Sequence, residues 1–285
     1  MKKVKYLFVP IIIITVSLIA AICQENLILL LYTTILALFP SELKSLFNNF
    51  FKDKQLRLSY SYLFNIQIGN CYLLVKDSQG RNQYQPVGGV YKYDANLVDI
   101  NELFHGTSDG LFADSNSSSN ELRIVINKRK LTDFNTWFKS YQSRETIENL
   151  GREFKEELID SNILKADIFE EIKYRYVGSF TEKGVNSSLR LPQIRHFDVV
   201  SFKPTNAQRT YLENLMRQTS FKYVFASKQD IENGFIQFAG HRYNIAEHAK
   251  LILVGNSSIL KKESHVKDIL NKDNSNNNSY VKIKL

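Results

Sequence analysis

Residues 152–158 read Arg-Glu-Phe-Lys-Glu-Glu-Leu, and this stretch decides how the rest of the chain is interpreted. Positions i, i+3 and i+4 share one face of an α-helix, so Glu153, Glu156 and Glu157 are expected to project together. Three carboxylates on one face repel one another unless a cation neutralises them, and Mg²⁺ takes such oxygen ligands. A solvated acidic face is the alternative interpretation of this segment alone. Apolar residues recur at helical spacing over 145–159, which predicts a helix there.

Segments with strand character lie on both sides of this helix. Alternating or continuous apolar residues predict strands at 56–68, 72–76, 86–91, 122–127, 174–180 and 197–202. Further helices are predicted at 207–217 and 245–254, and loops at 106–120 and 273–279. This interleaving of strands and helices predicts an α/β or α+β fold and excludes a helical bundle or an all-β barrel.

The first 46 residues are far more apolar than the remainder. Residues 6–23 carry no charge, and a second apolar stretch begins at 27 and reaches spanning length if its helix continues to 46, past Pro40 and Glu42. A membrane span needs about 20 apolar residues, so a hairpin of two transmembrane helices is predicted. Lysines flank the hairpin and are absent from its loop, which predicts that both termini and residues 47–285 are cytoplasmic, at a bacterial inner membrane. A cleaved secretory signal peptide is the alternative.

Composition and charge narrow the function classes. The chain of 285 residues has only two cysteines, which excludes a disulfide scaffold, and their spacing is not that of a zinc site. Its net charge of +8 suits an anionic ligand or a membrane surface. Arg195 is a candidate phosphate contact because a guanidinium can bind phosphate in a bidentate way. His196 and Asp198 follow it on the same predicted strand, where solvated charges of an edge strand are the plainer interpretation.

A glycine pair and the acidic helix together resemble the signature of the Nudix hydrolases. The residues that match are Gly88 and Gly89 at the end of a predicted strand, and Arg152, Glu153, Phe154, Glu156 and Glu157 on the helix. The resemblance implies an α/β/α sandwich that binds nucleoside diphosphate derivatives. It also implies catalysis with Mg²⁺ held by Glu153, Glu156 and Glu157, and with Arg152 holding one of the carboxylates in place.

The match to the signature is broken in three places. An insertion of about 95–144 separates the glycine half from the helical half. The signature glutamate falls on Ala95 when counted forward from Gly89, and on Arg144 when counted back from Arg152, with Glu145 one place out. Ile159 stands where the signature has glycine, although Asn162 near the C-cap offers another way to end the helix. Whether hydrolysis is retained is therefore left open.

The layout of two spans followed by an elaborated Nudix-like domain is similar to membrane-anchored effectors of cyclic-oligonucleotide-based anti-phage signalling systems (CBASS). The resemblance implies a cyclic oligonucleotide made by a partner nucleotidyltransferase (CD-NTase) and bound near Gly88, Gly89 and Arg195. It further implies a homo-oligomer whose spans disrupt the lipid bilayer in abortive infection, without binding DNA or RNA polymers. A membrane-tethered Mg²⁺-dependent Nudix hydrolase and a scaffold that binds no nucleotide remain alternatives.

Overall fold

The computed structural model describes residues 54–77, 80–111, 120–140, 142–253, 260–261 and 280–285. The predicted spans at 6–23 and 27–46 and the predicted loop at 273–279 lie outside these residues. In the described part of the chain, no helix is long and apolar enough to cross a membrane. The transmembrane hairpin and the domain boundary after residue 46 therefore stay predictions.

The larger sheet is built around β1 (Gln55–Asn65), which pairs in parallel with β9 and antiparallel with β7. Its strand order is β13-β8-β9-β1-β7-β6, and β5 pairs with the second half of β1. Nearly every residue of β1 is buried, because both faces of the sheet are covered. The other strands are β5 (Gly88–Val90), β6 (Thr107–Ser108), β7 (Arg123–Asn127), β8 (Glu171–Asn186), β9 (Leu191–Phe202) and β13 (Val281–Lys284).

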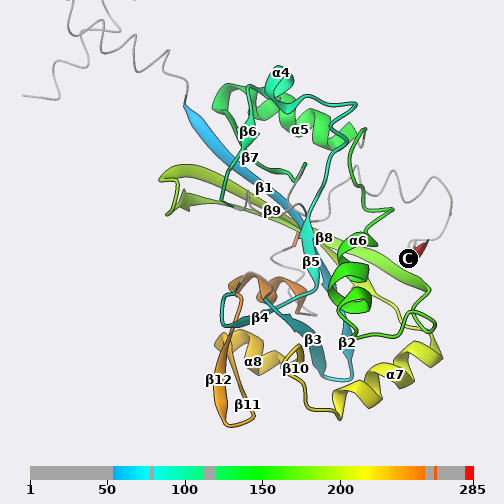
Figure 1. Ribbon diagram of the computed structural model, residues 1–285. Coiled ribbons are helices and arrows are strands. Elements are labelled where there is room, and N and C mark those ends of the chain that lie inside the picture. The colour runs from blue at the N-terminus through cyan, green and yellow to red at the C-terminus, as the bar shows by residue number, and fades with distance from the viewer. Residues whose placement is uncertain (1–53, 78–79, 112–119, 141, 254–259, 262–279) are drawn as a thin grey trace, which may run out of the picture. The chain divides into compact units, whose positions relative to one another are not determined.

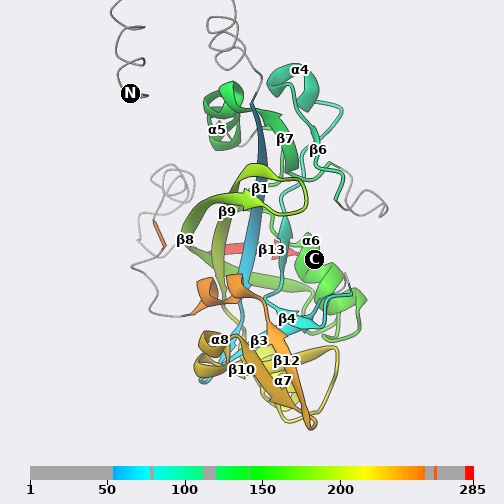
Figure 2. The same cartoon turned by 90° about the vertical axis from the view of Figure 1, so that its left-hand side faces the viewer.

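A second sheet continues from the end of β1. Its order is β10-β3-β4-β12-β11, with β2 paired to β3. The strands are β2 (Gln67–Ile68), β3 (Cys71–Lys76), β4 (Gln83–Gln85), β10 (Tyr223–Ser227), β11 (Phe235–Phe238) and β12 (His241–Ile245). Figures 1 and 2 both show this sheet below the larger one. The mixed α/β class is confirmed, and the two curled sheets fit a Nudix-like domain.

Helices complete two hydrophobic cores. The first core packs one face of the larger sheet against apolar residues of α4, α5, α6 and α7, and the second fills the space between β9, the second sheet, α8 and η4. The α-helices are α4 (Ile100–Phe104), α5 (Leu131–Ser140), α6 (Arg152–Phe154), α7 (Asn206–Met216) and α8 (Lys228–Asn233). Other helical turns are η2 (Lys128–Lys130), the π-helical η3 (Lys155–Asp160) and η4 (Glu247–Ile252).

The predicted insertion at 95–144 is closed at its base by backbone pairing. Tyr93 bridges Arg144, and the Glu145 amide donates to the carbonyl of Lys92 at 2.8 Å. Between these points the described residues form α4, β6, β7 and α5, and β7 joins the main sheet beside β1. The insertion thus supplies part of the core and returns the chain to the start of the acidic helix.

Two of the predicted helices differ from the structure. The helix predicted over 145–159 begins only at Arg152, because the segment before it is held by the Lys92 and Tyr93 pairing and by a turn in which the Thr146 amide donates to Asn149 at 2.7 Å. Within the helix predicted over 245–254, Glu247–Ile252 form the 3₁₀ helix η4 instead of an α-helix, Ile245 ends β12, and residue 254 lies outside the described residues. The helix at 207–217 is confirmed as α7, whose N-terminus is closed by a capping box of Thr205 and Gln208.

Candidate functional site

The two signature glycines lie on β5, where a larger residue would not fit. Gly88 pairs with Leu63 of β1, and a Cβ atom on Gly88 would overlap the carbonyl oxygen of Tyr62. A Cβ atom on Gly89 would instead overlap the carboxylate of Glu153. The structure therefore brings the glycine half of the signature against the acidic helix, and the absence of side chains lets the helix approach the strand.

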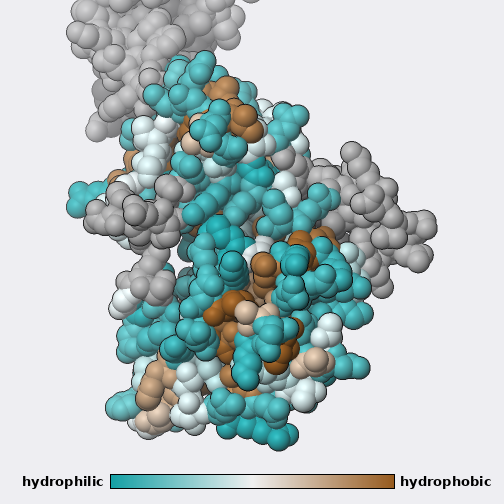
Figure 3. Space-filling view, turned by 45° about the vertical axis from the view of Figure 1, so that its right-hand side comes forward, coloured by the Kyte–Doolittle hydropathy of each residue, from teal (hydrophilic) through white to brown (hydrophobic). Residues whose placement is uncertain are grey.

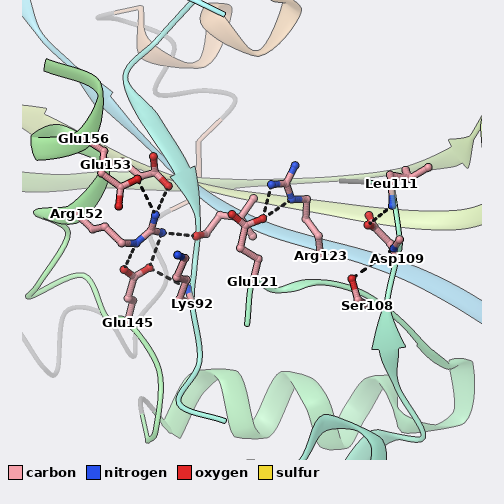
Figure 4. A network of polar contacts seen from close by, with 12 residues as sticks. Lys92, Ser108, Asp109, Leu111, Glu121, Arg123, Glu145, Arg152, Glu153 and Glu156 are labelled. Atoms are coloured by element: carbon pink, nitrogen blue, oxygen red, sulfur yellow. Dashed lines mark hydrogen bonds and ion pairs between the residues drawn. The ribbon is translucent and has the colours of Figure 1, made fainter. Parts of the chain in front are cut away.

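Arg152 is the centre of an ion-pair network between β5 and the helix (Figure 4). Its guanidinium contacts Glu145 at 2.7 Å through Nε, and it donates to the carbonyl of Val90 at 2.9 Å. A second nitrogen pairs with Glu153 and lies 3.7 Å from Glu156. Burial disfavours the charge of Arg152, but these acidic neighbours raise its pKa above the ordinary value. Arg152 therefore fixes the positions of the surrounding carboxylates.

Glu145 is the site residue that counting along the sequence misses. Besides pairing with Arg152, its Oε2 accepts a hydrogen bond from the Lys92 amide at 2.8 Å. The residue that counting places in the signature slot, Arg144, instead donates to the carbonyl of Phe138 at 2.8 Å and lies over the Phe138 ring. Pairing of Tyr93 with Arg144 sets this register, so the glutamate one place out fills the position next to Arg152.

The two inner carboxylates of the helix are crowded and poorly solvated. Burial raises the pKa of Glu153, with Glu156 adding to the rise and Arg152 opposing it. Burial and the negative charge of Glu153 raise the pKa of Glu157 to about 8, although the Gly88 amide donates to its Oε2 at 3.0 Å. Glu156 points outward with 45 % of its side chain exposed. Such raised pKa values in a group of like charges are typical of ligand sites.

Mg²⁺ suits these residues by ligand type, since carboxylate oxygens are the ligands that it takes. Among the described residues, however, no group of three or more His, Cys, Asp or Glu side chains is arranged to hold a metal ion. Glu153 is already paired with Arg152, and Glu157 accepts the Gly88 amide. Mg²⁺ at Glu153, Glu156 and Glu157 therefore stays a prediction.

The end of the acidic helix does not need the missing glycine. The helix continues as a π-helical turn through Asp160, and Asn162 just beyond it adopts a positive φ of 58°. Asn tolerates this left-handed conformation better than most residues. The prediction that Asn162 serves the C-terminal turn is confirmed. A π-helical turn within a site is itself frequent at functional positions.

Arg195 lies away from the acidic helix. On β9 it shares a face with Phe197, whose ring lies 5.8 Å from the guanidinium, and Phe197 belongs to the second core. Ile194 and His196 point to the other face, where the first core and the acidic helix lie. Arg195 forms its ion pair with Glu182 on β8. The structure therefore brings Gly88 and Gly89 to the acidic helix but does not bring Arg195 there.

A second polar cluster, formed by Ser179 of β8 with His196 and Asp198 of β9, is buried. The sequence favours solvated charges for His196 and Asp198. Asp198 is only 4 % exposed and accepts hydrogen bonds from Tyr91 at 2.7 Å, from Ser179, and from His196 at 3.2 Å. The interpretation as an edge strand with solvated charges is wrong, because β9 lies between β8 and β1. Burial would raise the pKa of Asp198, but the His196 charge and these hydrogen bonds hold it below its usual value.

The face of the molecule that bears α6 is mostly polar. Figure 3 turns the side of Figure 1 on which α6 lies toward the viewer, and hydrophilic side chains cover most of that face. Apolar side chains gather in its lower half, enclosed by polar ones. Large apolar residues that are strongly exposed in the described chain are scattered singly, as is usual: Leu97, Leu103, Val185, Met216 and Phe221.

A strand that begins with two glycines, packed against a helix bearing an arginine and three glutamates, defines a Nudix-like domain. The family model of the SMODS-associated NUDIX domain matches residues 55–253, which is most of the chain and nearly all of the two sheets. The chain belongs to this family. A comparison with curated proteins gives no match.

Proposed function

We propose that this chain is an effector of a cyclic-oligonucleotide-based anti-phage signalling system, in which the Nudix-like domain senses a cyclic nucleotide. The support is its membership of a SMODS-associated family together with a Nudix-like site whose glycines and charged residues are in contact. The ligand comes from a partner CD-NTase. The N-terminal segment responds by disrupting the inner membrane, which gives abortive infection.

The site offers a way to hold a phosphate despite its acidic side chains. Glu153, Glu156 and Glu157 would hold Mg²⁺, which would supply the positive charge that a phosphate needs beside these carboxylates. The protein groups set the geometry, because Arg152 orients Glu145 and Glu153, and the Gly88 amide orients Glu157. The net positive charge of the chain favours the approach of an anionic ligand.

Signalling requires that the ligand distinguish two states of the protein. A ligand with equal affinity for the resting and active arrangements shifts nothing, however tightly it binds. Homo-oligomerisation of the N-terminal segments in the lipid bilayer is the form of active state that we propose. Deletion of residues 1–46 should then abolish toxicity on signalling while nucleotide binding persists. Toxicity that survived this deletion would contradict the membrane mechanism.

Binding itself is tested by calorimetry on the full chain in detergent. The probes are cyclic di-AMP, cyclic di-GMP, cyclic UMP-AMP and cyclic tri-AMP, each with and without Mg²⁺. We expect saturable binding of at least one probe, and weakened binding in Glu156→Gln/Glu157→Gln. Failure of every probe to bind would move the assignment to a scaffold without a nucleotide ligand.

A Mg²⁺-dependent hydrolase is the second candidate, favoured by the contact of Glu153 and Glu157 with the two glycines. In that case the carboxylates would hold the metal that activates water and steadies the leaving phosphate. The test is turnover of ADP-ribose with Mg²⁺. Turnover that disappears in Glu156→Gln/Glu157→Gln would establish an enzyme, whereas no turnover beside intact cyclic-nucleotide binding would favour the sensor.

A further inference from the structure

The C-terminal strand β13 lies beyond the family match at 55–253 and touches the start of the acidic helix. It pairs antiparallel with the outer edge of β8, with Ile283 opposite Ile172 and Val281 opposite Tyr174. The Leu285 amide donates to the carbonyl of Glu170 at 2.9 Å. Figures 1 and 2 both place the C-terminus beside α6. The last residues of the chain are thus part of the wall around the candidate site.

Contact between this strand and the helix is made at Gly151, the residue that precedes α6. A Cβ atom on Gly151 would lie 2.8 Å from the Cδ1 of Ile283 and 3.0 Å from the Cδ2 of Leu285. Gly151 caps the helix without any side-chain hydrogen bond. Its carbonyl accepts from the Lys155 amide at 2.9 Å, which closes the first helical turn. Apolar packing from β13 therefore supports the helix start in addition to its backbone hydrogen bond.

The partner strand β8 also contacts the segment before the acidic helix. Tyr174, which pairs with Val281, donates its hydroxyl hydrogen to the carbonyl of Ile147 at 2.9 Å and accepts from the Leu150 amide at 3.0 Å. These bonds fix the segment that leads into Arg152. The turn that leads into Arg152 and Glu153 is therefore held by apolar contacts from β13 and by hydrogen bonds from Tyr174.

β13 is a short edge strand whose ion pairs are largely exposed. The strand has four residues with an alternating half-buried and exposed pattern. Its lysines pair with Glu171 and, at 3.1 Å, with Glu170, but all four side chains are at least half exposed, so these ion pairs contribute little. Val281, Ile283 and Leu285 provide the apolar contact with the first core.

We propose that β13 is a positioning and regulatory element of the acidic site. Packing of Ile283 and Leu285 on Gly151 sets the direction of Arg152 and Glu153, and detachment of the strand lowers ligand affinity. This regulation rests on the proposed function as a nucleotide-binding site. A change in affinity of about tenfold is expected when the strand leaves, within the usual range of coupling between two sites.

The test compares Ile283→Asp with Lys282→Asp in the full chain. The two variants place the same residue on adjacent positions, but only the first puts it against Gly151, since 62 % of the Lys282 side chain is exposed. Hydrogen exchange should accelerate at least tenfold over 151–158 in Ile283→Asp and stay unchanged over 223–227 in the second sheet. Lys282→Asp should leave exchange unchanged in both regions, and Ile283→Val should keep the wild-type protection.

Binding of the cyclic-nucleotide probes supplies the second readout. Ile283→Asp should weaken binding about tenfold, while Lys282→Asp and Ile283→Val retain the wild-type affinity. Equal acceleration of exchange in both regions would show a general loss of stability and overturn the positioning role. Unchanged exchange over 151–158 would overturn it as well. If the wild type binds no probe, the proposed function fails, and the exchange measurement still decides whether β13 positions the helix.

Discussion

Two polar clusters flank the aromatic pair Tyr62 and Tyr91, whose ring centroids are 5.1 Å apart. The pKa values of their carboxylates are shifted in opposite directions. Beside Tyr62, the carboxylates of Glu153 and Glu157 have raised pKa values because they are buried close to one another. Beside Tyr91, burial would raise the pKa of the Asp198 carboxylate, but three hydrogen-bond donors, one of them the charged His196, lower it.

The two clusters therefore differ in how their carboxylates are stabilised: Asp198 has its hydrogen-bond partners, whereas Glu153 and Glu157 lie close to a like charge. A buried carboxylate with all its hydrogen bonds made is favourable only while every partner remains. A group of crowded carboxylates is unfavourable by itself and gains when a cation arrives. Replacing carboxylate by amide should therefore have opposite effects on stability in the two clusters.

Asp198→Asn should give the largest loss of stability. The amide nitrogen cannot accept a hydrogen bond, so at least one of the buried donors on Tyr91, Ser179 and His196 loses its acceptor. We expect the free energy of unfolding to fall by about 3 kcal/mol, measured by urea denaturation at neutral pH. A loss below about 0.5 kcal/mol would show that the cluster is not a structural one.

The free energy of unfolding at acid pH gives a second test of this prediction. The folded-state pKa of Asp198 lies below its unfolded value, so its stabilisation is fully present above about pH 4 and is lost as the pH falls through the folded pKa. His196 and Tyr91 are the titratable groups that face it. Asp198→Asn should therefore show a shallower loss of stability below pH 4 than the wild type.

The two adjacent glycines should respond differently to alanine. In Gly88→Ala the new methyl group meets the backbone carbonyl of Tyr62, which cannot move without disturbing β1, and we expect a loss of about 2 kcal/mol. In Gly89→Ala it meets the side chain of Glu153, which can turn away only by giving up its ion pair with Arg152. Thermal unfolding should change less in the second variant, while probe binding is lost. Equal destabilisation by both substitutions would contradict this assignment.

Glu157→Gln is the counterpart of Asp198→Asn in the acidic cluster. The amide oxygen can still accept the Gly88 hydrogen bond, and the substitution removes a buried acid that lies close to Glu153. We expect stability to be unchanged or higher by up to about 1 kcal/mol in the presence of a chelator. Probe binding with Mg²⁺ should weaken at the same time. A loss of more than 1 kcal/mol would place Glu157 with the structural carboxylates.

The sequence predicted the acidic cluster better than the Asp198 cluster for a physical reason. Arg152, Glu153 and Glu157 lie within one helical turn or two, so local spacing brings them together. Their contact with Gly88 follows because a glycine pair on a strand permits close approach. Glu145 was missed since its position depends on pairing between Tyr93 and Arg144 across the insertion, and no local pattern encodes that register.

Burial of Asp198 depends on contacts that are distant in the chain. The β9 strand pairs in parallel with β1, so that Asp198 lies opposite Tyr62, and it pairs antiparallel with β8, so that Asp198 lies opposite Ser179. A charged residue alternating with apolar ones has the same pattern on an edge strand as on a central strand with buried polar partners. The pairing order of the strands, and not the alternation, distinguishes the two cases.

Arg195→Ala should have the smallest effect and tests whether the two faces of β9 act separately. Its ion pair with Glu182 is about one-third exposed on each side, so its loss should cost less than about 0.5 kcal/mol. Because Arg195 lies on the face of the second core, probe binding at the acidic helix should keep its affinity. Calorimetry on the full chain checks this, with Arg190→Ala on the exposed turn before β9 as the matched control. An affinity loss of tenfold or more in Arg195→Ala alone would place the ligand on the face of β9 that bears Arg195. A guanidinium can bind phosphate in a bidentate way, which is why the sequence makes Arg195 a candidate. The crowded carboxylates would then be a second site.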